Sequence, residues 1–266
     1  MDSAITVSET TPIKICLIGA GNVASHLARA LDKVADIIQI YSHSYDNSAK
    51  LAGSIGKPHI ATDSLKHITT DADYYIVSVK DDHIAEVANI TPDHGIWAHT
   101  SGSIPMSVFE GIKTQYGVFY PLQTFSKNVE LDITKVPFFI EGNNNTVANL
   151  LTELAGKISN IVEPADSKRR KALHIAAVFA CNFVNYMWIQ ADDLLKREGL
   201  DISFMKPLLE ETLNKIGNTS PTNAQTGPAR RGDTRIIDDH LSQLNGEQRD
   251  IYSLISKLIM KHYHNE

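Results

Sequence analysis

Short apolar runs alternate with amphipathic stretches over residues 13–162. The first run, residues 13–18, ends at Gly19, and residues 22–34 repeat apolar side chains at helical spacing. Further strands are predicted at residues 37–41, 74–79, 95–98, 117–120, 136–140 and 158–162. Helical spacing recurs at residues 47–55, 82–89 and 147–157. Strands that alternate with helices predict an α/β fold with a doubly wound, mostly parallel sheet of the Rossmann type.

The pattern changes at Pro164. Beyond it only helical periodicity remains, and it predicts helices at residues 167–196, 203–216, 235–244 and 247–262. A proline at a change from period two to period 3.6 marks a boundary. We therefore expect a Rossmann domain at residues 1–163 and an all-helical domain at residues 164–266.

Length and charge favour a small-molecule role. A chain of 266 residues is long enough for two domains, and a net charge of -6 gives no general attraction to nucleic acid or to an anionic membrane. Residues 1–12 are polar, so we expect neither a signal peptide nor a transit peptide and a cytoplasmic location. His262 and His264 have no acid or thiol beside them, so no metal site is expected.

One apolar stretch, residues 172–191, could imitate a membrane span. Its polar side chains include His174 and Gln190, which makes it too polar for confident insertion, so a buried core or interface helix is expected. The two cysteines, Cys16 and Cys181, lie in apolar runs, where buried reduced thiols are expected.

A glycine-rich sequence of the pattern G-x-G-x-x-A follows the first strand and opens the first helix. Its residues are Gly19, Ala20, Gly21, Asn22, Val23 and Ala24. In that context the first glycine permits a tight turn and the second lets the backbone approach a pyrophosphate at the helix N-terminus. The pattern predicts a dinucleotide site, with a ligand-free turn as the alternative.

The end of the second strand bears on the choice of cofactor. An NAD-selective site places an acid there, about 20 residues after the glycines. The chain has Ser42, His43 and Ser44 instead, and no acid before Asp46. Hydroxyl and imidazole groups can bind a 2'-phosphate, so NADP is favoured over NAD, although His43 could also be an ordinary exposed loop residue.

Residues at other strand ends should face the same crevice, because ligands of such sheets bind at the carboxyl ends of the strands. These residues are Val79, Lys80, His99, Ser101 and Gly102, with Gln123 as a possible orienting group for substrate. His99 could donate a proton or hydrogen bond, or it could simply satisfy the loop backbone.

A polar stripe is predicted on the long helix of residues 167–196. At 100° per residue, Lys171, His174, Asn182 and Asn185 fall within about 80° of one another. They stand among apolar side chains, and polar groups in such surroundings need partners. A bound substrate would supply them, and so would a neighbouring domain or subunit.

A second cluster, Thr226–Asp233, combines turn-forming residues with charge and shows no apolar pattern. Arg230 or Arg231 could bind a carboxylate or phosphate. The alternative is a capped turn in which Asp233 pairs with one of these arginines.

With these motifs, the whole chain resembles a bacterial family of Rossmann-like proteins assigned as NADP oxidoreductases, whose C-terminal helical domain has no established activity. The resemblance rests on the glycine loop and on the sequences His99–Ser103, Tyr120–Phe125, Lys171–His174 with Asn182, and Thr226–Asp233. More distantly the chain is similar to ketopantoate reductases, pyrroline-5-carboxylate reductases and hydroxyisobutyrate dehydrogenases. That similarity implies hydride transfer with NAD or NADP, a Rossmann domain joined to a helical domain, and a homodimer.

The expected function is NADP-dependent hydride transfer to or from a small, anionic carbonyl, imine or hydroxy compound. We assign the proton to Lys171 or His174, orientation to Asn182, and anion binding to Arg231. Gln123 and Asn185 are further expected substrate residues. A homodimer through the helical domain is expected because one layer cannot cover the apolar circumference of the long helix. The alternative is a dinucleotide-binding sensor without turnover, favoured by Ile175, which stands where hydroxyacid enzymes place an asparagine.

Overall fold

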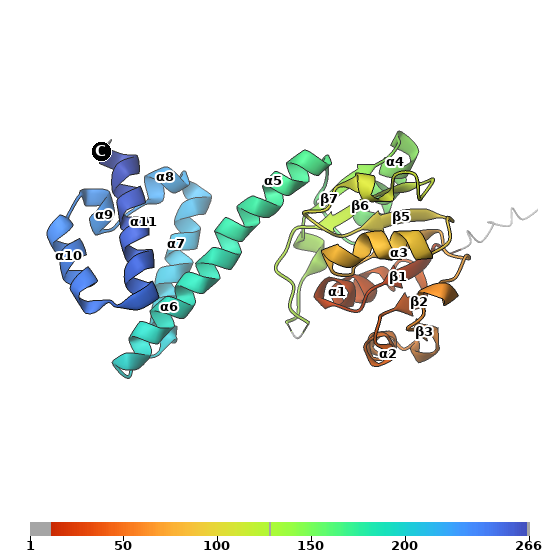
Figure 1. Ribbon diagram of the computed structural model, residues 1–266, viewed down its shortest axis with the longest axis horizontal. Coiled ribbons are helices and arrows are strands. Elements are labelled where there is room, and N and C mark those ends of the chain that lie inside the picture. The colour runs from red at the N-terminus through yellow and green to blue at the C-terminus, as the bar shows by residue number, and fades with distance from the viewer. Residues whose placement is uncertain (1–11, 128, 265–266) are drawn as a thin grey trace, which may run out of the picture. The chain divides into compact units, whose positions relative to one another are not determined.

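Eight strands form a single sheet in the computed structural model, which describes residues 12–127 and 129–264 (Figure 1). Its strands are β1 (Lys14–Ile18), β2 (Asp36–Tyr41), β3 (Ala61–Thr62), β4 (Tyr74–Val77), β5 (Ile96–His99), β6 (Tyr116–Pro121), β7 (Phe138–Gly142) and β8 (Val162–Pro164). Their order is β3-β2-β1-β4-β5-β6-β7-β8, and only the pairing of β6 with β7 is antiparallel. The strand order reverses between β1 and β4, and this position is called the switch point of the sheet. Ligands of such sheets bind in the crevice at the carboxyl ends of the strands on either side of it.

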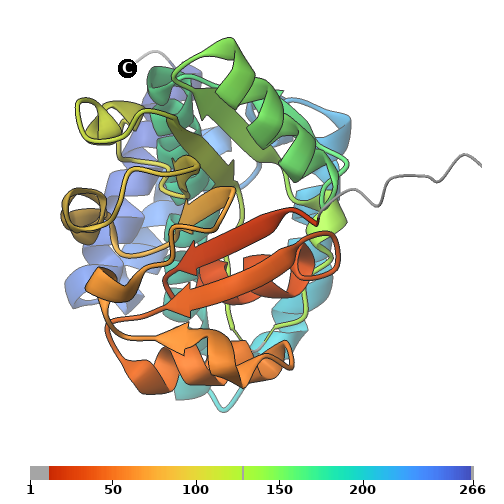
Figure 2. The same cartoon turned by 90° about the vertical axis from the view of Figure 1, so that its right-hand side faces the viewer.

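Helices cover both faces of this sheet (Figures 1 and 2). Residues alternate between the two faces: Ile15 and Leu17 of β1 join one apolar core, and Cys16 and Ile18 join the other. The first core includes α1 (Asn22–Leu31), α2 (Tyr45–Ser54) and α4 (Asn145–Gly156), and the second includes α3 (Ile84–Ile90). Burial on both faces explains why most positions of the parallel strands are apolar.

The predicted fold class is confirmed, and so is each predicted strand except the last, with most ends shifted by one or two residues. The last strand lies further along the chain than its predicted range, residues 158–162. The hydroxyl of Ser159 donates to Val136 O and Ile161 O, which forms a tight turn before β8 begins. Strand β3 has only two residues, too few to produce a periodic signal.

The described residues divide into two compact units, one ending at Cys181 and one beginning at Asn182. The second unit contains α6 (Val184–Arg197), α7 (Lys206–Asn218), α8 (Pro221–Ala224), α9 (Pro228–Arg231), α10 (Thr234–Gln243) and α11 (Gly246–His264). Only Ala229, Ile237 and Ser256 are buried among residues 182–264, so this unit has very little core of its own. The boundary between compact units therefore differs from the composition boundary at residues 163 and 164, because α5 (Ser167–Ala177) packs with the sheet.

A π-helical segment, Val178–Phe183, joins α5 to α6 within one continuous helix. A π turn holds one residue more than an α turn, so residues after it are rotated by about 100° relative to a regular helix. This segment contains Asn182 and precedes Asn185, so the uniform 100° spacing on which the predicted 80° stripe rests does not hold through Val178–Phe183.

Two expectations of burial on this helix are also wrong for the single chain. By length and composition the helix could cross a membrane, and an 18-residue window with mean hydropathy 1.4 has no buried residue. Cys181 in the π-helical segment is exposed, whereas Cys16 is buried as expected. The helix of residues 167–197 is therefore not a buried core helix of the single chain, and packing at an interface remains the other expectation.

Candidate cofactor and substrate site

The turn after β1 requires glycine at its first position. Gly19 has φ +125°, a conformation that L side chains rarely adopt, and its N–H donates to Tyr41 O at the end of β2. A Cβ added there would lie 2.2 Å from Ser78 O, just beyond β4. Gly19 therefore lets the carboxyl ends of three neighbouring strands approach one another.

The second glycine leaves space beside the start of α1. Gly21 is the exposed N-cap residue, with φ -79°, and a Cβ added to it would meet nothing within 4 Å. No side chain caps the helix, and its first turn contains no acid. Free N–H groups and the helix dipole at such an end favour an anion, and the open space lets it approach the backbone.

A cavity of about 470 Å³ lies at the crevice between the carboxyl ends of β1, β2 and β4. Its predicted lining residues are Gly19, Ala20, Gly21, Ser42, His43, Val79 and Lys80. The volume is in the usual range for small-molecule sites. The structure thus brings together seven of the residues selected from the sequence for cofactor binding.

Other residues of the cavity were not predicted: Tyr41, Asn47, Leu65, Ser78, His83, Glu86, Val87 and Lys127. Lys127 comes from the segment after β6, which also contacts α1: the Asn22 side-chain amide donates to Phe125 O, and His26 Nε2 lies 3.0 Å from Ser126 O. Strand-end reasoning could have found Lys127, since it follows the Tyr120–Phe125 motif. His83 and Glu86 carried no signal, because their place depends on how α3 packs.

Four residues predicted for the cofactor loop or its ribose end do not line this cavity. The Asn22 amide is bound to Phe125 O, Val23 is half-buried, and Ala24 is fully buried in the core beneath the loop. Ser44 begins α2, and its N–H lies 3.4 Å from the Ser42 hydroxyl. For these residues any contact with a dinucleotide would come from the backbone or the rim.

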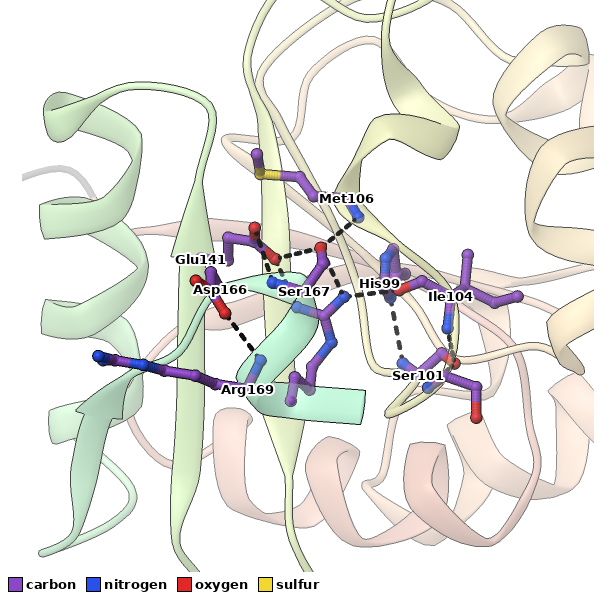
Figure 3. Close-up of polar contacts among 10 residues, drawn as sticks. His99, Ser101, Ile104, Met106, Glu141, Asp166, Ser167 and Arg169 are labelled. Carbon is purple, nitrogen blue, oxygen red and sulfur yellow. Dashed lines mark hydrogen bonds and ion pairs between the residues drawn. The ribbon is translucent and has the colours of Figure 1, made fainter. Parts of the chain in front are cut away.

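His99 is placed inside the protein. Its Nδ1 accepts the N–H of Ser101 (Figure 3). Its side chain is fully buried, and its ring packs 5.7 Å from that of Phe109. Burial, assisted by the charge of Arg170, lowers the pKa of His99 to about 3, so it is neutral at pH 7. This placement favours the loop-organising alternative over proton donation, because no surface of the ring can reach a ligand.

The loop after β5 is held by its own side chains. Ser101 Oγ accepts the N–H groups of Ser103 and Ile104, so Ser101 is occupied as well as buried (Figure 3). Thr100 connects this loop to the cofactor cavity, since its hydroxyl donates to Ser78 Oγ at 3.2 Å. The loop is therefore continuous with the wall of the cavity.

Gly102 lies against a polar pair formed by Tyr120, at the end of β6, and His174, on α5. The hydroxyl oxygen of Tyr120 is 3.2 Å from His174 Nδ1, and the two rings meet edge-on at 6.3 Å. A Cβ on Gly102 would approach His174 Nδ1 to 2.7 Å and Tyr120 Cζ to 2.8 Å. Burial raises the pKa of Tyr120, although Arg170 opposes this, so the phenol is neutral at pH 7.

Arg170 fixes α5 against the sheet, a role that the sequence did not reveal. Its side chain is 1% exposed, pairs with Glu141 of β7 at 2.5 Å and donates to Ile104 O at 2.6 Å. Ser167 donates both its N–H and its hydroxyl to Glu141, and it accepts the N–H of Met106 (Figure 3). The only signal was a run of four basic residues, 168–171, at a helix start, where the dipole disfavours them.

The remaining predicted residues are exposed. Lys171 and Gln123 belong to the first unit, and Gln123 Oε1 accepts the N–H of Thr124. Asn182, Asn185 and Arg231 belong to the second unit.

The Thr226–Asp233 cluster is partly apolar packing. Ala229 is buried, and Pro228 and Ala229 line an apolar cavity of about 350 Å³ together with residues of α6 and α11. Asp233 caps α10 by accepting the N–H of Ile236, and Arg230 stacks on the Tyr263 ring at 4.0 Å. The capped turn is observed, but no ion pair joins Asp233 to either arginine among the described residues.

A doubly wound sheet with a glycine turn and a cavity at its switch point defines a dinucleotide-binding protein of the Rossmann class. Residues 14–99 match the family model described as NADP oxidoreductase coenzyme F420-dependent, and residues 136–259 match a domain of unknown function, DUF2520. A crystal structure of a candidate NADP oxidoreductase from Bacteroides fragilis is 41% identical, with a TM-score of 0.87, over 94% of this chain and 98% of that one. The chain belongs to this family of NADP oxidoreductases with a DUF2520 region.

Two more distant structures share the fold over nearly the whole chain. A Thermotoga maritima protein is 22% identical with a TM-score of 0.77, covering 94% of this chain and 99% of that one. A reductive aminase from Aspergillus terreus is 12% identical with a TM-score of 0.71, covering 96% and 95%. Comparison with curated proteins gave no match.

Proposed function

We propose that the chain reduces a small carbonyl or imine compound with NADPH, binding the dinucleotide in the cavity beside Gly19 and Gly21. The observation that carries this proposal is the open space at Gly21, at an uncapped helix start, within a 470 Å³ cavity of the switch point. Lys80 and Lys127 line the same cavity and add positive charge for a pyrophosphate. The chemistry of these residues fits a dinucleotide.

The protein's part in the reaction is to orient the substrate and move one proton. A nicotinamide cofactor supplies the hydride when bound. His174, at the carboxyl edge of the sheet, is the group best placed among the predicted residues to give a proton to the substrate oxygen or nitrogen, since it is half-buried and held by Tyr120. Lys171 is exposed one turn earlier and provides charge for an anionic substrate.

The choice of a carbonyl or imine rests on likeness of fold. The Aspergillus terreus enzyme is a reductive aminase in complex with NADPH4, cyclohexanone and allyl amine. A ketone and an amine together supply a C=N bond, whose carbon accepts hydride in the same way as that of a C=O bond. We extend this reaction class to the present chain, whose polar pair can serve either acceptor.

NADP preference is part of the same proposal. Ser42 and His43 line the cavity at the end of β2, whereas Asp46 does not. Glu86 is the one acid among the described lining residues, and its Oε2 lies 3.1 Å from Nδ1 of His83. Two imidazoles and a hydroxyl facing one acid favour a 2'-phosphate over a free ribose hydroxyl.

The helical unit is proposed to form a homodimer. Thirteen of the nineteen exposed large apolar side chains in the described residues lie between Phe183 and Leu258, in a unit with three buried residues. Such a surface needs cover, and a second copy of the chain is the partner that is always present. A cytoplasmic location is consistent with this interpretation, in which the long helix packs at an interface rather than in a membrane.

The test is the affinity for NADPH after Gly21→Ala. An alanine at this position meets no protein atom within 4 Å and keeps an allowed φ of -79°, so the variant should fold with unchanged thermal stability. A bound pyrophosphate needs that space, so the dissociation constant should rise at least about tenfold, roughly 1.4 kcal/mol. Gly53→Ala, equally unobstructed in α2, is the matched control and should bind NADPH normally. Equal affinity in Gly21→Ala and the parent would contradict the proposed site.

A further inference from the structure

Tyr120 holds the ring of His174, the proposed proton donor. Tyr120 is 7% exposed at the end of β6, with Phe139 on the neighbouring strand 6.5 Å from its ring. Its hydroxyl oxygen has one hydrogen-bond partner among the described residues, His174 Nδ1 at 3.2 Å. A buried phenol held against one nitrogen of an imidazole selects which nitrogen remains free.

We propose that Tyr120 is a positioning residue that accepts a hydrogen bond from His174 Nδ1–H, so that Nε2 is the nitrogen that gives a proton to the substrate. The inference rests on the proposed function and adds to it the atom through which the proton moves.

The surroundings of the pair leave Nε2 as the available nitrogen. Gly102 packs on the Nδ1 side so closely that a single added carbon would lie 2.7 Å from that atom. No hydrogen bond from His174 Nε2 to another described residue is present. A substrate therefore meets Nε2, while Nδ1 is enclosed by Tyr120 and Gly102.

The helix that carries His174 is itself fixed. Arg170 lies four residues earlier, on the same face of α5, and its buried pair with Glu141 ties that face to β7. The ring is thus oriented by Tyr120 and the backbone by Arg170. Such support is what keeps a proton donor within reach of a reacting atom.

The direction of the hydrogen bond follows from the proton that must be transferred. In the protonated ring both nitrogens carry hydrogen, and Nδ1–H donates to Tyr120. As hydride reaches the carbon of C=O or C=N, the π electron pair moves to oxygen or nitrogen and takes the proton from Nε2. The neutral ring that remains keeps Nδ1–H, so the bond to Tyr120 is the same before and after, and solvent returns the proton to Nε2. A Tyr120 that donated instead would have to change from donor to acceptor each time the ring became protonated.

The first test is the tautomer of neutral His174 in the cofactor-free protein, measured by long-range nitrogen–proton NMR on histidine-labelled samples, with His174→Gln for assignment. We expect the Nδ1–H form in the parent and its loss in Tyr120→Phe, which keeps the ring and its packing. Tyr116→Phe, on the same strand and without a hydroxyl hydrogen bond among the described residues, is the control and should resemble the parent. An Nε2–H form in the parent, or an unchanged tautomer in Tyr120→Phe, would overturn the inference.

The second test is NADPH oxidation with a panel of small ketones, 2-oxo acids and ketone–amine mixtures. On a compound that the parent reduces, Tyr120→Phe should lower kcat at least about tenfold and change KM by less than about twofold, as expected when orientation of an acid is lost. An unchanged kcat would overturn the inference. If the parent reduces nothing in the panel, the proposed reaction fails, and the tautomer result alone decides the role of Tyr120.

Discussion

The buried imidazole of His99 makes the protein sensitive to acid, and the size of that effect can be worked out. The pKa of His99 falls from 6.5 to about 3, first because burial disfavours the charged ring and second because of Arg170. In the unfolded chain the ring takes up a proton below pH 6.5, while in the folded protein it stays neutral down to about pH 3. The unfolded state therefore binds more protons in this window, and stability falls as the pH falls.

Between pH 6.5 and about pH 3, the loss of stability is set by the pKa of His99 in the unfolded chain, because the folded protein takes up no proton there. Each pH unit below 6.5 costs about 1.4 kcal/mol, so at pH 5 the protein should have lost about 2 kcal/mol relative to pH 8 through this residue alone. A glutamine at position 99 cannot take up a proton here. His99→Gln should be less stable than the parent at pH 8, because packing against Phe109 is lost, but that difference should shrink by about 2 kcal/mol at pH 5.

Urea unfolding of the parent and of His99→Gln at pH 8, 7, 6 and 5 measures this difference. His59→Gln, an exposed histidine outside both cores, is the matched control and should follow the parent across the series. A constant difference between the parent and His99→Gln from pH 8 to pH 5 would refute the reasoning, since His99 would then take up its proton equally in both states.

Three further outcomes are expected. Arg170→Met should destabilise the protein by about 3–5 kcal/mol in thermal or urea unfolding, because it leaves the Glu141 carboxylate without its buried partner. The exposed control, Arg169→Met, should change stability by less than about 0.5 kcal/mol. Similar losses of stability in both variants would show that Arg170 does not anchor α5. Calorimetric titration should show tighter binding of NADPH than of NADH, and His43→Ala should reduce the difference between their dissociation constants. Equal affinities of the parent for the two cofactors would contradict the proposed preference for NADP. Light scattering of detergent-free protein at micromolar concentration should give twice the mass of one chain, and a monomer would count against the interface on the helical unit.

The sheet was accessible from the sequence because its signals are local. Residues such as Ile15 and Tyr75 belong to apolar strands that alternate with helices. The turn after β1 could be predicted from Gly19, because its positive φ favours glycine. The π-helical segment of the long helix was not predicted, because one extra residue in a turn leaves no mark in hydrophobic spacing. Whether a side chain faces a core depends on long-range packing.

The candidate site shows the same division. The loops that line the cofactor cavity could be predicted from the sequence, because the carboxyl ends of parallel strands lie at one edge of the sheet. Partners from distant segments could not be predicted. The sequence therefore did not reveal that Arg170, next to Lys171, is the buried partner of Glu141, or that Tyr120 is the partner of His174. These pairs join residues 29 and 54 positions apart, where periodicity carries no information.

Transfer of deuterium from NADPH labelled at C4 would show whether the protein carries hydride to a substrate. The parent protein would be incubated with the labelled cofactor and the panel of ketones, 2-oxo acids and ketone–amine mixtures, and the products examined by mass spectrometry. We expect one deuterium on the former C=O or C=N carbon of a product. At a cofactor concentration near the parent's dissociation constant, Gly21→Ala should give much less of this product, and Gly53→Ala should give as much as the parent. Tight binding of NADPH with no deuterium in any product would contradict turnover and favour a dinucleotide sensor.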